Sequence, residues 1–415
     1  MSPTPRTALL LGAIALSALL IPVWIAVLAA LALFAAAAVD ALAVRRRPRL
    51  DRTAPDLIAR GVPATLRLAP SETIPGSVRL RQPLPPDLTL EPSEAEGELT
   101  STLVARRRGR HVLPPAAVRV SGPLGLGRWY HRVLEDTELL VYPDLPTAYR
   151  LALAVRKSRF RETGERSRGP LGLGTEFESV RDYLPDDDIR QVNWAATARL
   201  GRPMSNQYRI EQDRDVILLV DAGRLMSAPL GERTRLDAAV DAAVAVATVA
   251  DEIGDRSGAL AFDREVRRRT PPRRRGGRVV VRALFDLEPT ASDSDYELAF
   301  RSVGGSKRAY VLVLTDLLEE TAARPLVDAM PVLRRHHAVA VASSADTDLE
   351  AMLSKEPASA RDAYAAAVAL EVLGARAAVA AQLRRAGADV IEAPPERLAA
   401  ACVRAYLRAK LHAQL

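Results

Sequence analysis

A run of three adjacent aspartates is the first feature of this sequence that could support chemistry. The run occupies residues 186–188 and is surrounded by Arg181, Arg190 and Arg199. Adjacent carboxylates can act as an acid–base pair or as metal ligands, which makes a hydrolase one function to consider. The same carboxylates repel one another unless arginines pair with them. Since no histidine or cysteine lies nearby, we favour a charge-paired segment that joins domains or docks a partner.

Two further aspartates each follow a run of apolar residues. Asp221 comes directly after residues 216–220, and Asp316 closely follows residues 310–314. Continuous apolar runs of this length are typical of strands that are buried on both faces. Ligands of parallel sheets bind at the carboxyl ends of the strands. Both aspartates are therefore expected at a ligand-binding edge.

The chain from residue 205 to residue 415 alternates between predicted strands and helices. Besides the two apolar runs above, strands are expected at 258–262, 338–342 and 388–391. Helices are expected at 236–253, 278–287, 324–335, 358–384 and 395–411. This alternation predicts a doubly wound α/β domain, in which helices cover both faces of a parallel sheet.

An arginine-rich stretch, residues 267–278, follows the second predicted strand. We expect a solvated loop, with anionic lipid or an acidic protein as alternative partners. Nucleic acid is not an expected partner, because the stretch has no aromatic residues on which bases could stack.

The first forty residues differ from a soluble segment. Residues 7–39 carry no charged side chain, and an apolar run of 18 or more residues is a candidate membrane span. These 33 residues would form a helix of about 50 Å, against roughly 30 Å of hydrocarbon. Pro22 lies near the middle, so a hairpin of two short helices is favoured over one long tilted helix. A cleaved signal peptide fits poorly, because the run is too long and ends in arginines.

Arginines lie on both sides of this apolar run. Arg6 precedes it, and the cluster that follows comprises Arg45, Arg46, Arg47 and Arg49. Positively charged flanks prefer the cytoplasm. The predicted location is therefore the cytoplasmic membrane, with the soluble domains in the cytoplasm.

Residues 50–150 are predicted to form a small antiparallel β-sandwich, since short apolar runs alternate there with turns rich in proline and glycine. The runs are 64–68, 77–80, 99–104, 117–120 and 138–141. The predicted organisation is a transmembrane hairpin with a basic flank (1–49), this β domain (50–150), a linker with the aspartate-rich segment (151–204), and the α/β domain (205–415).

Several functions are excluded by composition and motif. The single cysteine, Cys402, rules out a disulfide framework and cysteine-based zinc or redox sites. A net charge of +7 over 415 residues does not require a nucleic-acid partner. Metalloprotease, nucleophile-elbow and P-loop motifs are all missing from the sequence. We therefore expect a protein that is not an enzyme, with no cofactor and no small-molecule substrate.

Residues 174–199 resemble the signature of the domain of unknown function 58 family, approximately G-x-x-F-x-x-x-R-x-Y-x-x-G-D-D-x-R-x-I-x-W-x-x-x-A-R. The matching positions are Gly174, Phe177, Arg181, Tyr183, Asp187, Asp188, Arg190, Trp194 and Arg199. Asp186 replaces the usual glycine, and Val192 replaces the usual isoleucine. We call residues 174–199 the signature segment and expect it to serve structure or docking, with Tyr183 and Trp194 as apolar anchors.

The resemblance implies a membrane hairpin, a β domain and a von Willebrand factor A-like domain. It also implies a MoxR-type AAA+ ATPase as partner, in a chaperone-like or envelope-related role. Von Willebrand A domains bind Mg²⁺ through a D-x-S-x-S motif, a threonine and a late aspartate, an oxygen-rich ligand set.

The corresponding residues here are Asp221, Ser294 and Asp316, and both serines of the first motif are absent. Arg224 stands in that motif, and we expect it to neutralise Asp221 or Asp316. We therefore expect no Mg²⁺ affinity stronger than about millimolar.

The arginines on both flanks generate a prediction about membrane topology. Reporters fused after residue 1 and after residue 415 should both lie in the cytoplasm, because the arginines on both sides of the apolar run favour the cytoplasmic side. Enzymatic reporters that are active on only one side of the membrane provide the measurement. An external signal from the N-terminal fusion alone would indicate a single span, and an external signal from the C-terminal fusion would reverse the orientation.

Overall fold

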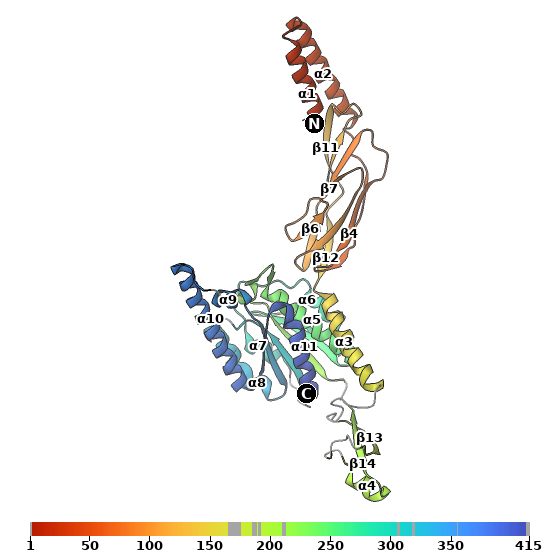
Figure 1. The fold of residues 1–415 in the computed structure, drawn as a ribbon. Coiled ribbons are helices and arrows are strands. Elements are labelled where there is room, and N and C mark those ends of the chain that lie inside the picture. The colour runs from red at the N-terminus through yellow and green to blue at the C-terminus, as the bar shows by residue number, and fades with distance from the viewer. Residues whose placement is uncertain are drawn as a thin grey trace. The chain divides into compact units, whose positions relative to one another are not determined.

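The computed structural model describes residues 2–164, 176–184, 189, 192–209, 213–304, 308–317, 320–354 and 356–411. The chain divides into two compact units, Met1–Tyr142 and Pro143–Leu415 (Figure 1). The first combines two apolar helices with a set of β-sheets, and the second is a mixed α/β unit.

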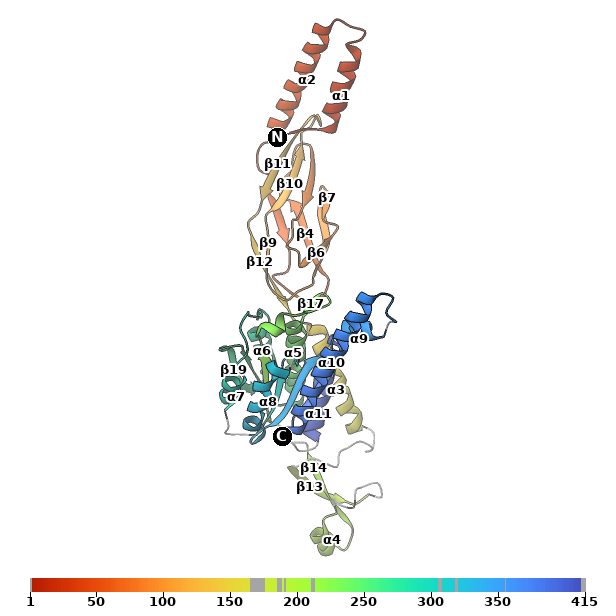
Figure 2. The ribbon, with the colours of Figure 1, turned by 90° about the vertical axis from the view of Figure 1, so that its left-hand side faces the viewer.

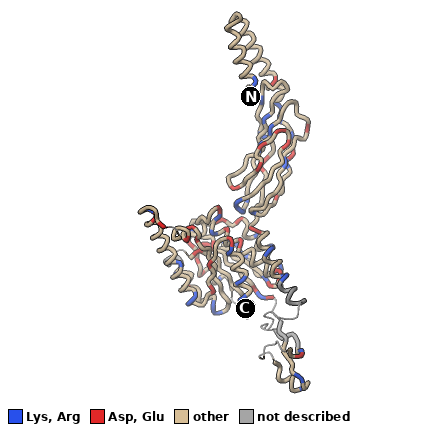
Figure 3. The backbone as a smooth tube through the Cα atoms, in the orientation of Figure 1, with Lys and Arg blue, Asp and Glu red and all other residues tan. Residues whose placement is uncertain are grey.

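Two apolar helices, α1 (Pro5–Ser17) and α2 (Val23–Ala43), begin the first unit. Thr4 caps α1, and Pro22 precedes α2, where a missing N–H costs nothing. The helices lie side by side and bear no charge along most of their length (Figures 2 and 3). By length and composition, α2 could cross a membrane, at about 31 Å for 21 residues. α1, with 13 residues, is about 20 Å long.

The rest of the first unit consists of three sheets around one apolar core. Their strand orders are β1-β11-β10-β5-β7, β2-β4-β8-β6 and β3-β12-β9. The strands are β1 (Ser2–Pro3), β2 (Leu50–Thr53), β3 (Leu57–Ala59), β4 (Ala64–Pro70), β5 (Ser77–Arg81), β6 (Leu88–Glu91), β7 (Glu94–Glu96), β8 (Leu99–Ala105), β9 (Gly109–Leu113), β10 (Ala116–Ser121), β11 (Gly127–Val133) and β12 (Thr137–Tyr142). All five predicted apolar runs lie in strands, and every pair except β3–β12 is antiparallel. In β10 alternate residues are buried, as expected of a strand with one face on a core.

A glycine-rich loop, residues 122–127, attaches α2 to the sheets. The carboxylate of Asp40 accepts hydrogen bonds from the backbone N–H groups of Leu124, Leu126 and Gly127, at 2.8–2.9 Å. A Cβ on Gly127 would lie 2.2 Å from the carbonyl oxygen of Ala37 in α2, so only glycine allows this approach. The Thr4 hydroxyl donates to the carbonyl of Gly125 at 2.6 Å. Both apolar helices are thus fastened to one loop, which we call the carboxylate clamp.

The second unit contains a six-stranded sheet in the order β19-β18-β15-β20-β21-β22, within the described part of the chain. The five strands from β18 to β22 in this order run parallel, and β19 is antiparallel to β18. Its strands are β15 (Asp215–Asp221), β18 (Arg256–Phe262), β19 (Val266–Arg274), β20 (Ala309–Leu314), β21 (Ala338–Ser344) and β22 (Asp389–Ala393). Except for β19, these are the strands that the sequence predicts.

Helices cover both faces of this sheet. The helices are α3 (Leu145–Gly164), α5 (Arg235–Ile253), α6 (Gly277–Leu284), α7 (Tyr296–Val303), α8 (Glu320–Arg334), α9 (Thr347–Leu353), α10 (Ala360–Arg385) and α11 (Pro395–Leu411). Valines and leucines on one side of β15, β20 and β21 share a core with α7, α8 and α10. α5 packs on the opposite face, beneath α3, α6 and α11, and is buried along nearly its whole length. α10 also passes the length and composition test for a membrane span, but it packs on α8 and β22.

Two sequence predictions about this unit are corrected by the structure. The predicted boundary at residue 150 falls inside α3, whose Ala148 and Ala152 are buried and which packs on α5. The arginine-rich stretch is not a loop, because residues 266–274 form β19 at the edge of the sheet. Arginines, prolines and irregular register are the usual means of keeping a sheet edge from pairing with another chain.

The carboxylate clamp generates a prediction about stability. Replacing Asp40 with alanine removes the acceptor of three backbone N–H groups, so we expect a loss of about 2–3 kcal/mol or more in the unfolding free energy of the first unit. Thermal unfolding of the full chain in detergent is the measurement. Asp51→Ala, which removes an exposed aspartate of the same unit, is the matched control. Equal melting temperatures for the two variants would contradict a stabilising clamp.

Candidate functional site

At the carboxyl ends of β15 and β20 the connections leave the sheet toward opposite faces, which makes this the topological switch point of the sheet. These strands are neighbours, yet the helix after β15 covers one face and the helix after β20 covers the other. Open α/β sheets bind ligands at such a point, because the loops diverge there. Asp221 ends β15 and Asp316 follows β20, as the sequence predicts. Both side chains are nearly completely buried.

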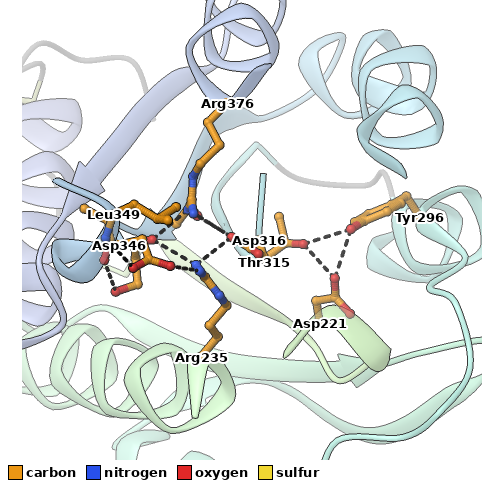
Figure 4. A network of polar contacts seen from close by, with 11 residues as sticks. Asp221, Arg235, Tyr296, Thr315, Asp316, Asp346, Leu349 and Arg376 are labelled. Carbon is orange, nitrogen blue, oxygen red and sulfur yellow. Dashed lines mark hydrogen bonds and ion pairs between the residues drawn. The ribbon is translucent and has the colours of Figure 1, made fainter. Parts of the chain in front are cut away.

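Hydroxyl groups surround the carboxylate of Asp221 (Figure 4). One of its oxygens accepts hydrogen bonds from the Thr315 hydroxyl at 2.6 Å and the Tyr296 hydroxyl at 2.9 Å. The other accepts from the backbone N–H of Gly223 at 2.8 Å and from the Ser294 hydroxyl. Burial, and next the charge of Asp221, raise the pKa of Tyr296 far above its usual value, so the phenol keeps its proton as a donor. The Asp221 carboxylate therefore has donors on both oxygens.

Two buried arginines hold the carboxylate of Asp316 (Figure 4). One of its oxygens accepts from Arg235 at 2.9 Å and from Arg376 at 3.0 Å. Arg235 also pairs with Asp346 at 2.8 Å, and Arg376 donates to the carbonyl of Ser344 at 2.7 Å. Burial raises the pKa of Asp316, and the two arginines act in the opposite direction. Two arginines and two aspartates therefore balance their charges at this edge.

This arrangement does not fit the Mg²⁺ site that the family resemblance implies. Ser294 and Asp221 are brought together, but Asp316 faces guanidinium groups that a cation would have to displace. Within the described ranges, no three histidine, cysteine or carboxylate side chains are grouped to hold a metal. Arg224 pairs with the exposed Asp293, so the prediction that Arg224 neutralises Asp221 or Asp316 is wrong.

The two arginines that do neutralise Asp316 were missed by the sequence analysis. Arg235 follows Thr234, the capping residue of α5, and was not singled out. The burial of Arg376 could have been predicted, because its neighbours three and four positions away along α10 are all apolar: Val372, Leu373, Val379 and Ala380. A lone arginine on an apolar helix face is buried with a partner far more often than it is left unpaired.

An open groove of about 910 Å³ lies beside the Asp221 network. Residues 291–297 and α8 line it, and Ser294 and Tyr296 belong to its wall. Three of its exposed acidic side chains are paired, Asp293 with Arg224, Glu297 with Arg301 and Asp328 with Arg324. The fourth, Asp295, caps α7, and the positive charge of Arg264 also lines the groove. The groove is therefore close to neutral rather than a cation-attracting surface.

The signature segment is only partly described. Gly174, Asp187, Asp188 and Arg190, together with Asp186, lie outside the described residues. Phe177 and Arg181 belong to β13 (Glu176–Asp182), which pairs antiparallel with β14 (Met204–Arg209). Trp194 and Arg199 belong to α4 (Trp194–Leu200), which Asn193 caps. The backbone N–H of Tyr183 donates to the carbonyl of Pro203 at 2.9 Å.

The exposure of Trp194 corrects one expectation about this segment. The side chain is 69% exposed, so Trp194 is not a buried anchor. Leu184, Ile189 and Leu200 are exposed as well. Tyr183 is half-buried. No described contact bears on a hydrolase function for residues 186–188, because the cluster lies outside the described residues.

A family model and several curated proteins match this sequence. The model of a family described as "Protein of unknown function DUF58" matches residues 179–383. Uncharacterized proteins of Mycobacterium tuberculosis and Mycobacterium bovis are each 36% identical over 106 residues, which is 25% of this chain and 32% of theirs. The chain thus spans about a third of the length of the curated relatives that it matches.

Two solved structures resemble small parts of the chain. One is the PKD domain of an M14-like peptidase from a Thermoplasmatales archaeon, with 10% identity, 22% of this chain, 91% of that chain and a TM-score of 0.16. The other is the superoxide reductase (neelaredoxin) of Ignicoccus hospitalis, with 15% identity, 25% of this chain, 89% of that chain and a TM-score of 0.15. At these TM-scores neither structure informs fold or function.

The buried charge network generates a prediction about stability. Arg376→Met removes one of the two cations from Asp316, and breaking a buried ion pair typically costs about 3–5 kcal/mol. Denaturant unfolding of the α/β unit within the full chain is the measurement. Arg361→Met, which changes an exposed arginine in the first turn of the same helix, should leave stability nearly unchanged. Similar stabilities of the two variants would mean that Arg376 does not contribute to holding α10.

Proposed function

We propose that this chain, which belongs to the DUF58 family through residues 179–383, is a membrane-anchored interaction protein. The observation that carries the proposal is the exposure of Trp194, Ile189, Leu184 and Leu200 in and beside the signature segment. These four side chains lie within residues 184–200, and we infer that they form one apolar surface of the kind that marks interaction sites. Tryptophan is also enriched among the residues that contribute most to binding energy.

The strand order supports the reading of the second unit as a von Willebrand A-like domain. In chain order the six strands are arranged 3-2-1-4-5-6, with the third antiparallel. The site at which such a domain binds Mg²⁺ corresponds here to Asp221, Ser294 and Asp316. Because Arg235 and Arg376 supply the positive charge at Asp316, we propose a scaffold that keeps its shape without an ion.

The carboxylate clamp supports a hairpin as the membrane anchor. Residues at the start of α1 and near the end of α2 both contact residues 122–127. A bilayer cannot separate two helix ends that touch the same loop, so α1 and α2 would enter and leave on one side. A single span would place Ser2 across the membrane from Arg128, with which it pairs in the sheet.

The family resemblance suggests the partner, a MoxR-type AAA+ ATPase, and a chaperone-like or envelope-related role. The exposed apolar side chains of the signature segment are the contact that we propose for it. The hydrolase alternative has no described contact in its favour and is not carried further.

Co-purification tests this proposal. Full-length protein, extracted from its native membrane in detergent, should retain an AAA+ ATPase identified by mass spectrometry. Trp194→Ala should reduce the retained ATPase about tenfold or more, because central tryptophans contribute about 2 kcal/mol or more at interfaces. The melting temperature should change little, since Trp194 is exposed.

Tyr364→Ala is the matched control for this experiment. Tyr364 is an aromatic residue of α10 with similar exposure, 74%, outside the signature segment. Equal retention of the ATPase by both variants, or no ATPase with the unmodified protein, would contradict the proposed contact.

A further inference from the structure

A cavity of about 470 Å³ lies at the amino-terminal edge of the six-stranded sheet, opposite the Asp221 and Asp316 site. The residues that line it belong to the starts of β20, β21 and β22 and to the ends of α8, α10 and α11. Its charged and polar side chains are Arg308, Tyr310, Arg334, Arg384, Asp389 and Arg408. We call it the arginine cavity. Its volume is within the usual range for small-molecule sites, about 300–1,000 Å³.

The arginine cavity has more positive charge than its carboxylates neutralise. Arg408 approaches Asp389 at 3.5 Å, and Arg384 approaches Glu392 at 3.7 Å. Both contacts are long and exposed, and such pairs are weak. Among the described residues, Arg308 and Arg334 form no ion pair. Two guanidinium groups therefore remain available to an anion.

A buried hydroxyl group adds a second, independent observation. Tyr310 is 2% exposed, and its hydroxyl has no hydrogen-bond partner within the described parts of the chain. Burial raises the pKa of Tyr310, so the hydroxyl is a proton donor. After burial, Cys402 has the largest effect on this pKa, followed by Asp389 and Arg408, and the last two line the cavity. A buried donor without an acceptor costs stability unless a ligand or water satisfies it.

The backbone at the end of α10 leaves room for one of these arginines. Gly387 has a φ of +91°, and a Cβ there would lie 2.9 Å from Nε of Arg334. A side chain at this position would push the guanidinium of Arg334 aside, so glycine leaves room for it, and the positive φ itself favours glycine.

Helix termini account for part of the charge but not for all of it. Arg334, Arg384 and Arg408 stand in the last turns of α8, α10 and α11, where cations offset the partial negative charge of a helix end. Arg308 is outside any helix, and the Tyr310 hydroxyl has no such role. The partial charge of a helix end therefore does not explain these two groups.

We propose that the arginine cavity binds a small soluble anion that carries at least two phosphate charges, with Arg308 and Arg334 as its cationic contacts and the Tyr310 hydroxyl as a donor. Guanidinium groups match phosphate oxygens in geometry and charge. This binding site is separate from the docking function proposed above, because neither Trp194 nor the apolar helices take part.

Calorimetric titration of the full chain in detergent with sodium pyrophosphate tests the proposal. At about 0.15 M salt, where long-range attraction is screened, pyrophosphate should bind with a measurable dissociation constant. Arg334→Ala and Arg308→Ala should each weaken binding about tenfold or more. Tyr310→Phe should weaken it by about threefold or more, while its melting temperature without ligand stays the same or rises.

Two controls separate this site from general attraction to arginine. Arg361→Ala removes an exposed arginine of α10, and Arg269→Ala removes one from the basic edge strand β19. Neither should change the affinity. No measurable pyrophosphate binding, or a loss as large in Arg269→Ala as in Arg334→Ala, would overturn the proposal. A lower melting temperature for Tyr310→Phe with unchanged affinity would overturn the role of the hydroxyl.

Discussion

Two carboxylates buried at the carboxyl ends of adjacent strands are the constraint on which the α/β unit depends. A carboxylate removed from water requires donors or cations, and the two aspartates meet this requirement differently. Asp221 is surrounded by hydroxyls from two distant segments, whereas Asp316 is held by arginines from α5 and α10. The direct contacts to the two carboxylates join residues up to 94 positions apart, and the Arg235–Asp346 pair joins residues 111 positions apart. The two aspartates at this edge are therefore part of the framework of the unit.

The regular elements of this unit could be predicted because their physical cause is local. Strands buried on both faces need unbroken apolar runs, and all five predicted strands of the second unit are present. β19 could not be found in this way, because an edge strand tolerates the arginines and prolines that normally signal a loop. The positions of Asp221 and Asp316 followed from strand polarity alone. The residues that pair with these aspartates could not be predicted, since long-range pairing leaves little trace in a single sequence. Arg376 is the exception, because it is isolated on an apolar helix face.

The two edges of the sheet differ in how their charges are used. At the carboxyl edge, Arg235 and Arg376 balance the charges of Asp316 and Asp346, and neutral donors satisfy Asp221. At the opposite edge, arginines outnumber carboxylates and are largely exposed.

The exposure of Trp194 could not be predicted from the sequence either. Its residue type suggested burial, yet the side chain is exposed, and only the structure distinguishes a buried anchor from a contact surface.

The carboxylate clamp also has a consequence for the order of events during synthesis. Asp40 and the three N–H groups that it binds are 84–87 residues apart. At about 5–20 residues per second, a ribosome needs roughly 4–17 s to make that stretch. The apolar helices are complete before the loop that fastens them exists, and Ser2 must wait equally for its partner in β11. During that interval Asp40, the only carboxylate of these two helices, is still without its donors. The first unit closes only after the chain has grown past residue 127.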